Sequence, residues 1–247
     1  MTETTPTTPT TPPTSATATT DAAKAARTRG DIDQTILADI KLAEDVAAAA
    51  QDIDHKDKLA EEDLPPTAAS ELLTLAQAAR ERVGQVVTAK KAKLSSTQNE
   101  EKALNSLMAA LRDLQQRAKR KFPKGDPKLA AYGIGKTNFG RDRESLEQDA
   151  ENAIKLATAD ALPGVKPEKL TAAGAALAAW KQADKDQHKA KEAQGKLLDL
   201  LNAKVAELNT KRREIQLAAD TAWPHTDKAN VPVRRAFKLS ATQPIAK

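Results

Sequence analysis

The sequence predicts an all-α protein built as two tandem duplicated three-helix bundles, coiled-coil-like and up-down, behind a disordered N-terminal tail. Three observations lead to this prediction. Alanine and charged residues dominate a chain of 247 residues that has only six aromatic side chains, a composition that favours helices over sheets. Apolar residues recur at steps of three and four. A short aromatic-proline motif occurs twice, about 100 residues apart.

Residues 1–30 are expected to form the tail. The first 22 residues contain eleven threonines and four prolines, with almost no charge and no large apolar cluster. Such a segment cannot bury enough surface to offset the entropy lost on ordering. Its predicted role is that of a tether or spacer.

Residues 31–140 are predicted to form the first unit, with three helices. The first helix ends before Leu64-Pro65, where two consecutive prolines prevent its continuation. A second helix is expected to end near Ser95, and Thr97 with Glu100 has the capping-box spacing that starts a third. The three predicted apolar stripes are Ile36, Ile40, Ala43, Ala47 and Ala50; Leu72, Ala76, Ala79, Val83 and Val86; and Leu104, Leu107, Leu111, Leu114 and Ala118.

Residues 141–247 are predicted to repeat this plan and to end in an extended C-terminal segment. Leu162-Pro163 closes the first helix of this unit, and Pro167 suits the first turn of the next. Gly195 could break that helix, or the helix could continue through it, because one glycine costs only about 1 kcal/mol relative to alanine.

The duplication rests on matching motifs at a nearly constant offset. Each unit ends in an exit motif, Phe122-Pro123-x-x-Asp126 in the first and Trp223-Pro224-x-x-Asp227 in the second, 101 residues apart. Leu64-Pro65 matches Leu162-Pro163 at an offset of 98, and Tyr132 matches Phe237 at 105. The aromatic residue of each exit is expected to close the end of its bundle, with Tyr132 or Phe237 packing back onto the helices.

No constellation in the sequence predicts catalysis, a cofactor or a metal. The chain has no cysteine and three histidines, and none of the histidines belongs to a recognisable nucleophile or metal motif. Gly135-Lys136-Thr137 looks like the end of a phosphate-binding loop, but Ala130 stands where the first glycine of that loop is needed. A flexible hinge is the better interpretation.

Charge is distributed unevenly along the chain. Residues 31–79 carry a net charge of −9 and residues 80–143 a net charge of +10, within a total of +5. An acidic helix next to a basic one favours mutual compensation inside one bundle. The densest cationic cluster could instead bind an anion such as a nucleic-acid phosphate: Arg117, Lys119, Arg120, Lys121, Lys124 and Lys128. A second patch could form from residues 211–213 with Arg234 and Arg235.

The predicted function is a non-enzymatic structural or protein-interaction module that could self-associate through apolar helical faces left over after bundle formation. The alternative is a polyanion-binding protein that uses the clusters near residues 117–128 and 211–213. A protein partner or a second copy is the expected partner, with nucleic acid second. The sequence shows no signal peptide and no transmembrane segment, so a cytoplasmic location is expected.

Overall fold

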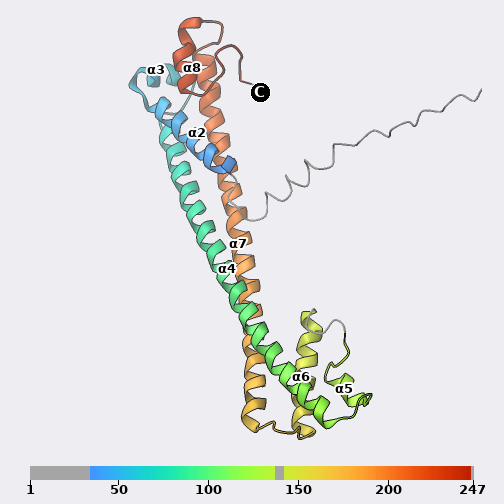
Figure 1. The fold of residues 1–247 in the computed structure, drawn as a ribbon. Helices are drawn as coiled ribbons and strands as arrows, with labels where there is room; N and C mark the ends of the chain where they lie inside the picture. Colours follow the sequence, from blue (N-terminus) through green and yellow to red (C-terminus); the bar gives the residue numbers. More distant parts are fainter. Residues whose placement is uncertain (1–33, 137–141, 246–247) are drawn as a thin grey trace, which may run out of the picture.

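The computed structural model describes residues 34–136 and 142–245, and two very long helices dominate it. Helix α4 (Ala68–Lys121) and helix α7 (Pro167–Ala222) contain 54 and 56 residues and lie side by side in opposite directions (Figure 1). At about 1.5 Å per residue, each is about 80 Å long. The described residues form helices and turns and no β-strand. The predicted tail, residues 1–30, lies outside them.

Shorter helices cover the two ends of this pair (Figure 1). Helices α2 (Gln34–Gln51) and α3 (Ile53–Glu61) pack at one end, where the 3-10 helix η1 (Lys228–Asn230) and helix α8 (Val231–Ala236) also lie. Helices α5 (Pro127–Ala131) and α6 (Arg143–Ala159) pack at the other end. The all-α prediction is therefore confirmed.

Each end has its own hydrophobic core, and each core draws on both halves of the chain. The first core joins α2, α3 and the first part of α4 to the last part of α7, Trp223 and Phe237. The second joins the last part of α4, Tyr132 and α6 to the first part of α7. The boundary expected near residue 140 therefore does not separate two cores. The helices of the first half of the chain pack against helices of the second half at both ends. The sequence instead predicts one separate bundle for each half.

The break expected at Ser95–Thr97 is wrong, because α4 continues through it. The Thr97 hydroxyl donates to the carbonyl oxygen of Lys93, 3.0 Å away and one turn back, as a threonine inside a helix does. Glu100 is buried and accepts a hydrogen bond from the indole Nε1 of Trp180, at 3.3 Å. The side chains of Thr97 and Glu100 therefore do not form the predicted capping box. Helix α7 likewise runs through Gly195.

The predicted apolar stripes and proline breaks are largely confirmed. Fifteen stripe positions were predicted in the first half, and twelve of them are buried. The chain turns before Leu64-Pro65 and before Leu162-Pro163, and the residue preceding each pair has a positive φ, 58° at Asp63 and 44° at Ala161. The same backbone conformation thus recurs at the offset of 98 residues.

Short helices follow the two exit prolines: α5 after Pro123, and η1 with α8 after Pro224. The extended C-terminal segment predicted from the sequence is therefore helical in its first part. The Asp126 carboxylate accepts from the backbone N–H of Lys128, at 2.8 Å, and caps α5. The Asp227 carboxylate accepts from the N–H of Ala229, at 2.9 Å, and caps η1. An aspartate side chain that satisfies a free N–H starts a helix, and this is the physical reason for the difference.

Candidate functional site

The basic cluster predicted at residues 117–128 lies at the end of α4, against the end of α6. Three of its six cations are bound within the fold. Arg117 pairs with Asp113 at 2.9 Å and donates to the carbonyl of Pro163 at 3.0 Å. Lys121 donates to the carbonyl of Asp160, and Lys128 pairs with the Asp160 carboxylate at 2.6 Å. These contacts attach α4 and α5 to the loop after α6.

The electrostatics of this end agree with a structural role for those three cations. Arg117 holds the pKa of Asp113 below its usual value, and Lys128 does the same for the pKa of Asp160. Burial raises the pKa of the Tyr132 phenol, which donates a hydrogen bond to Asp160 at 3.0 Å. Arg117 is neutralised by Asp113, one helical turn away, and Lys128 by Asp160, which is 32 residues away in the sequence.

The other three cations of the cluster are Lys119, Arg120 and Lys124, and all are exposed. Within the described part of the chain, none of them makes an ion pair or a side-chain hydrogen bond. The surface available to an anion is therefore about half of the predicted cluster.

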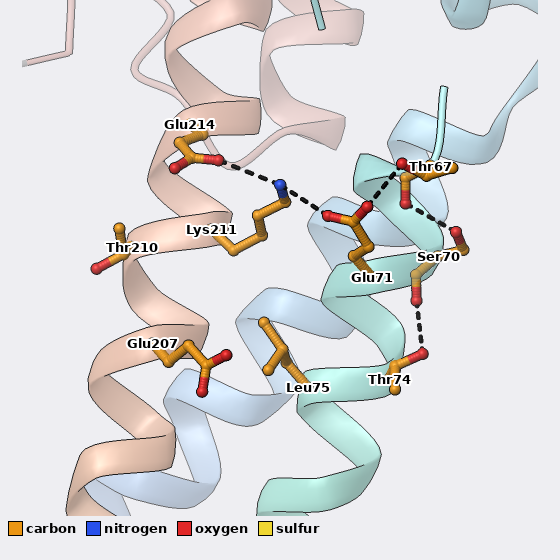
Figure 2. A pocket seen from close by; sticks show the side chains of 9 residues that line it. All are labelled: Thr67, Ser70, Glu71, Thr74, Leu75, Glu207, Thr210, Lys211 and Glu214. Atoms are coloured by element: carbon orange, nitrogen blue, oxygen red, sulfur yellow. Dashed lines mark hydrogen bonds and ion pairs between the residues drawn. The ribbon is translucent and has the colours of Figure 1, made fainter. Parts of the chain in front are cut away.

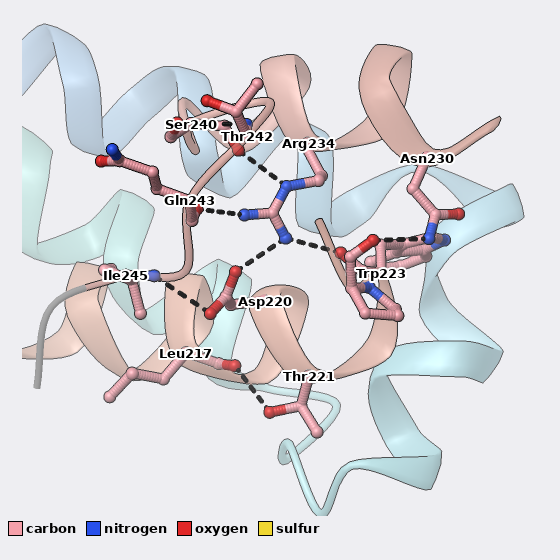
Figure 3. A network of polar contacts seen from close by, with 11 residues as sticks. Leu217, Asp220, Thr221, Trp223, Asn230, Arg234, Ser240, Thr242, Gln243 and Ile245 are labelled. Carbon is pink, nitrogen blue, oxygen red and sulfur yellow. Dashed lines mark hydrogen bonds and ion pairs between the residues drawn. The ribbon is translucent and has the colours of Figure 1, made fainter. Parts of the chain in front are cut away.

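The second predicted patch is divided between the surface and the interior. Arg234 is fully buried and lies at the centre of a polar network that closes the first end (Figure 3). Its guanidinium donates to the carbonyls of Ser240, Trp223 and Gln243 at 2.8, 2.6 and 2.9 Å, and its Nη1 lies 2.7 Å from Asp220 Oδ1. Arg234 is a structural residue and not part of a surface patch, whereas Arg235 is exposed.

Lys211 lies in a groove of about 740 Å³ between the start of α4 and the end of α7 (Figure 2). Its ammonium bridges Glu71 at 2.8 Å and Glu214 at 3.4 Å, and the hydrogen bond from Lys211 lowers the pKa of Glu71. The hydroxyls of Ser70 and Thr74 donate to carbonyls of their own helix. The polar side chains of this groove thus already have partners within the protein, and the ion pair between Lys211 and Glu71 links α7 to α4.

The two ends are closed by the same contacts. The Gln115 side chain donates to the carbonyl of Tyr132, and the Gln216 side chain donates to the carbonyl of Phe237, both at 2.9 Å. Both aromatic residues are fully buried. The next residue has a positive φ in each case, 74° at Gly133 and 57° at Lys238. The closure that follows Phe122-Pro123 thus recurs after Trp223-Pro224.

The middle of the rod, which we call the waist, consists of residues 87–102 of α4 and 181–196 of α7. None of these residues, all of which the structure describes, belongs to a hydrophobic core. The cores stop at Val86 on one side and resume at Ala103 on the other. Helix α6 reaches only the end of the waist nearest the second core, where Arg143 pairs with Glu100 and Asp184, and where Glu147 and Glu151 pair with Lys181.

A groove of about 410 Å³ opens on the waist, lined by Val87, Lys90, Lys91, Lys93, Leu94, Thr97 and Gln194. Val87 is 38% exposed and Leu94 is 60% exposed, and the two side chains lie two helical turns apart in the same groove. The sequence did contain a signal for this surface: the stripes assigned to α4 stop at Val86 and start again at Leu104.

Comparison with known proteins gave no match: no protein family, no curated protein and no solved structure is similar to this chain. Within residues 34–136 and 142–245, no group of three or more His, Cys, Asp or Glu side chains is placed to hold a metal ion. None of the helices described is both long and apolar enough to cross a membrane.

Proposed function

We propose that this protein is a non-enzymatic interaction scaffold, a rod with two closed ends and an open docking surface at its waist. The observation that carries the proposal is the contrast between the ends and the middle. Both ends bury most of their apolar side chains under a third helix and expose single ones such as Ile53 and Leu217, whereas the waist exposes Val87 and Leu94 together in one groove. An apolar surface that the fold itself does not cover is typical of an interaction site.

The scaffold is proposed to consist of two copies of one unit that exchange partners. The matching Gln115 and Gln216 hydrogen bonds, the paired exit aspartates and the positive φ values at offsets of 98 and 105 support this proposal. In this arrangement each end combines the beginning of one unit with the exit of the other. Two similar ends on one chain hold the waist at a fixed distance from both.

Site-specific photo-crosslinking in the cells of origin tests the scaffold proposal. A photoreactive side chain placed at Leu94 in the waist should capture a protein, whereas the same group at the exposed Gln116, on a part of α4 that α6 covers, should not. Equal capture at both positions, or none at Leu94, would contradict a docking role for the waist.

A second candidate function is polyanion binding through Lys119, Arg120 and Lys124. It is supported by the exposure of these three cations and by the absence of partners for them among the described residues. Titration of a DNA or RNA duplex at two salt concentrations tests it. Binding that falls steeply with salt and is lost in Lys119→Glu/Arg120→Glu supports this function, and no binding at low salt eliminates it.

A further inference from the structure

We infer that the waist groove binds an amphipathic helix whose apolar face is flanked by acidic side chains. This inference rests on the proposed scaffold function and specifies the partner's chemistry. It follows from the shape of the groove, from the charge around it and from one buried amide that lines it.

The shape of the groove favours a helix. At each end of the rod, a third helix lies against α4 and α7, α2 at one end and α6 at the other. In the groove of the waist, between Val87 and Thr97, the lining residues come from α4 and α7 alone. From Val87 to Thr97 the groove extends along ten residues of α4, or about 15 Å, which is about three turns of a docked helix. A helix laid in an apolar groove is a common mode of peptide recognition.

The charge around the groove favours an acidic partner. Residues 87–97 contain three lysines and no acidic residue, and Lys91 and Lys93 have no ion-pair partner in the part of the chain that the structure describes. The whole waist has nine lysines and five acidic residues, a net charge of +4. Two of those five carboxylates, Glu100 and Asp184, are held by Arg143 at the far end of the waist.

The same charge argues against a second copy of this chain as the occupant. Waist-to-waist pairing would bring two surfaces of net charge +4 together, and like charges at an interface suppress association. Lysine stems lie along apolar surface while their ammonium groups reach its rim. A partner with leucines in the centre and glutamates at the edges therefore matches this groove.

Gln194 adds a polar contact for the partner. It is only 5% exposed, lines the groove, and makes no hydrogen bond with any described residue. Its amide atoms are not among the fully buried polar atoms that lack a hydrogen-bond partner, so they still reach solvent at the groove. Covering this amide without giving it a hydrogen bond would cost free energy. A docked helix with a polar side chain at its centre would satisfy this amide, and a purely apolar helix would not.

Binding of a designed peptide to the full chain tests the inference. The probe is a fluorescent helical peptide of about 15 residues, with leucines along one face and glutamates on both flanks. Fluorescence anisotropy should show saturable binding that weakens as salt is raised. A peptide with the same leucines and lysine flanks, and an acidic peptide with its leucines scrambled around the helix, should each bind about tenfold more weakly or not at all.

Variants of the chain locate the site. Leu94→Glu and Lys91→Glu/Lys93→Glu should each weaken binding of the acidic peptide by about tenfold or more. The matched control is Lys155→Glu/Lys228→Glu, which makes the same change in net charge at two exposed lysines on the ends of the rod and should leave the affinity unchanged. Circular dichroism confirms that each variant keeps its helices.

Three outcomes would overturn the inference. One is equal loss of binding in the waist variants and the control, which would show attraction by net charge alone. Another is a single-stranded RNA that binds the waist while the acidic peptide does not. The third is a concentration-dependent dimer that Leu94→Glu dissociates, which would make a second copy the occupant. If the acidic peptide fails while Leu94 still captures a protein in cells, the partner chemistry is wrong and the scaffold function stands.

Discussion

Replacing Arg234 by methionine should strongly destabilise the end of the rod that contains α2, α3 and α8. The side chain is fully buried and makes three hydrogen bonds to carbonyls and one ion pair with Asp220. Methionine fills a similar volume but leaves the carbonyls and the Asp220 carboxylate without their cation. Removing one partner of a buried ion pair costs about 3–5 kcal/mol, because an uncompensated charge remains.

The expected loss is large enough to measure by thermal unfolding. For a chain of this size, about 1 kcal/mol corresponds to about 2–4 °C in Tm, so Arg234→Met should lower Tm by about 6–20 °C. The two tryptophans separate the ends, because Trp223 belongs to the first core and Trp180 to the second. In the Trp180→Phe background, fluorescence reports the damaged end alone.

The matched control for this prediction is Arg235→Met, the neighbouring arginine, which is exposed. It should change Tm by about 1–2 °C at most, since exposed substitutions away from special contacts stay within about 0.5 kcal/mol. Equal effects of the two substitutions would refute the reasoning, because the loss would then come from net charge and not from the buried network.

Three further predictions concern the ends and the exchange between halves. Gln115→Ala and Gln216→Ala should each reduce the free energy of unfolding by about 1 kcal/mol, measured by urea denaturation, if the two closures are equivalent; a loss at only one end would contradict the equivalence. Burial raises the pKa of Tyr132, so the folded state keeps the phenol neutral, and this stabilisation is complete below pH about 10 and is lost as pH rises further. Phenolate absorbance of this single tyrosine should therefore appear together with the loss of helical circular dichroism, and ionisation near pH 10 in a folded protein would show the prediction to be wrong. Separate chains of residues 31–140 and 141–247 should each lack stable tertiary structure and should fold when mixed, because both cores need both halves; calorimetric transitions in either chain alone would contradict this.

Local features of the fold could be predicted from the sequence because they depend on short-range chemistry. The spacing of Ile40, Ala43 and Ala47 determines which face of α2 is buried, whatever helix covers it. The prolines after Leu64 and Leu162 end their helices through steric clash alone. The aromatic residues at the exits close the cores because nothing else of comparable size is available nearby.

The partner of each stripe could not be predicted, since periodicity does not identify the covering helix. Tandem bundles and exchanged bundles bury the same residues of α2, α4, α6 and α7. The choice depends on whether the chain breaks near Ser95, and α4 continues through that segment as one helix.

The tertiary partners of the predicted basic cluster also could not be identified from the sequence. Nothing in the sequence places Asp160 beside Lys128, 32 residues away, so the contacts of Lys121 and Lys128 with Asp160 appear only in the folded chain. Only the exposure of Lys119, Arg120 and Lys124 agrees with a surface patch.

The exchange of halves is also the reason that the groove at the waist exists at all. Tandem bundles would fold each long helix back on itself near its middle, and residues 87–102 would then lie in a turn. Because α4 and α7 instead run unbroken from one core to the other, their middle parts form a groove between Val87 and Thr97 whose lining comes from these two helices alone. Shortening α4 and α7 by whole turns within the waist would bring the cores together and remove the groove. The lysines and small residues of the waist keep this two-helix stretch hydrated, while Val87 and Leu94 retain the apolar contact that a third helix needs.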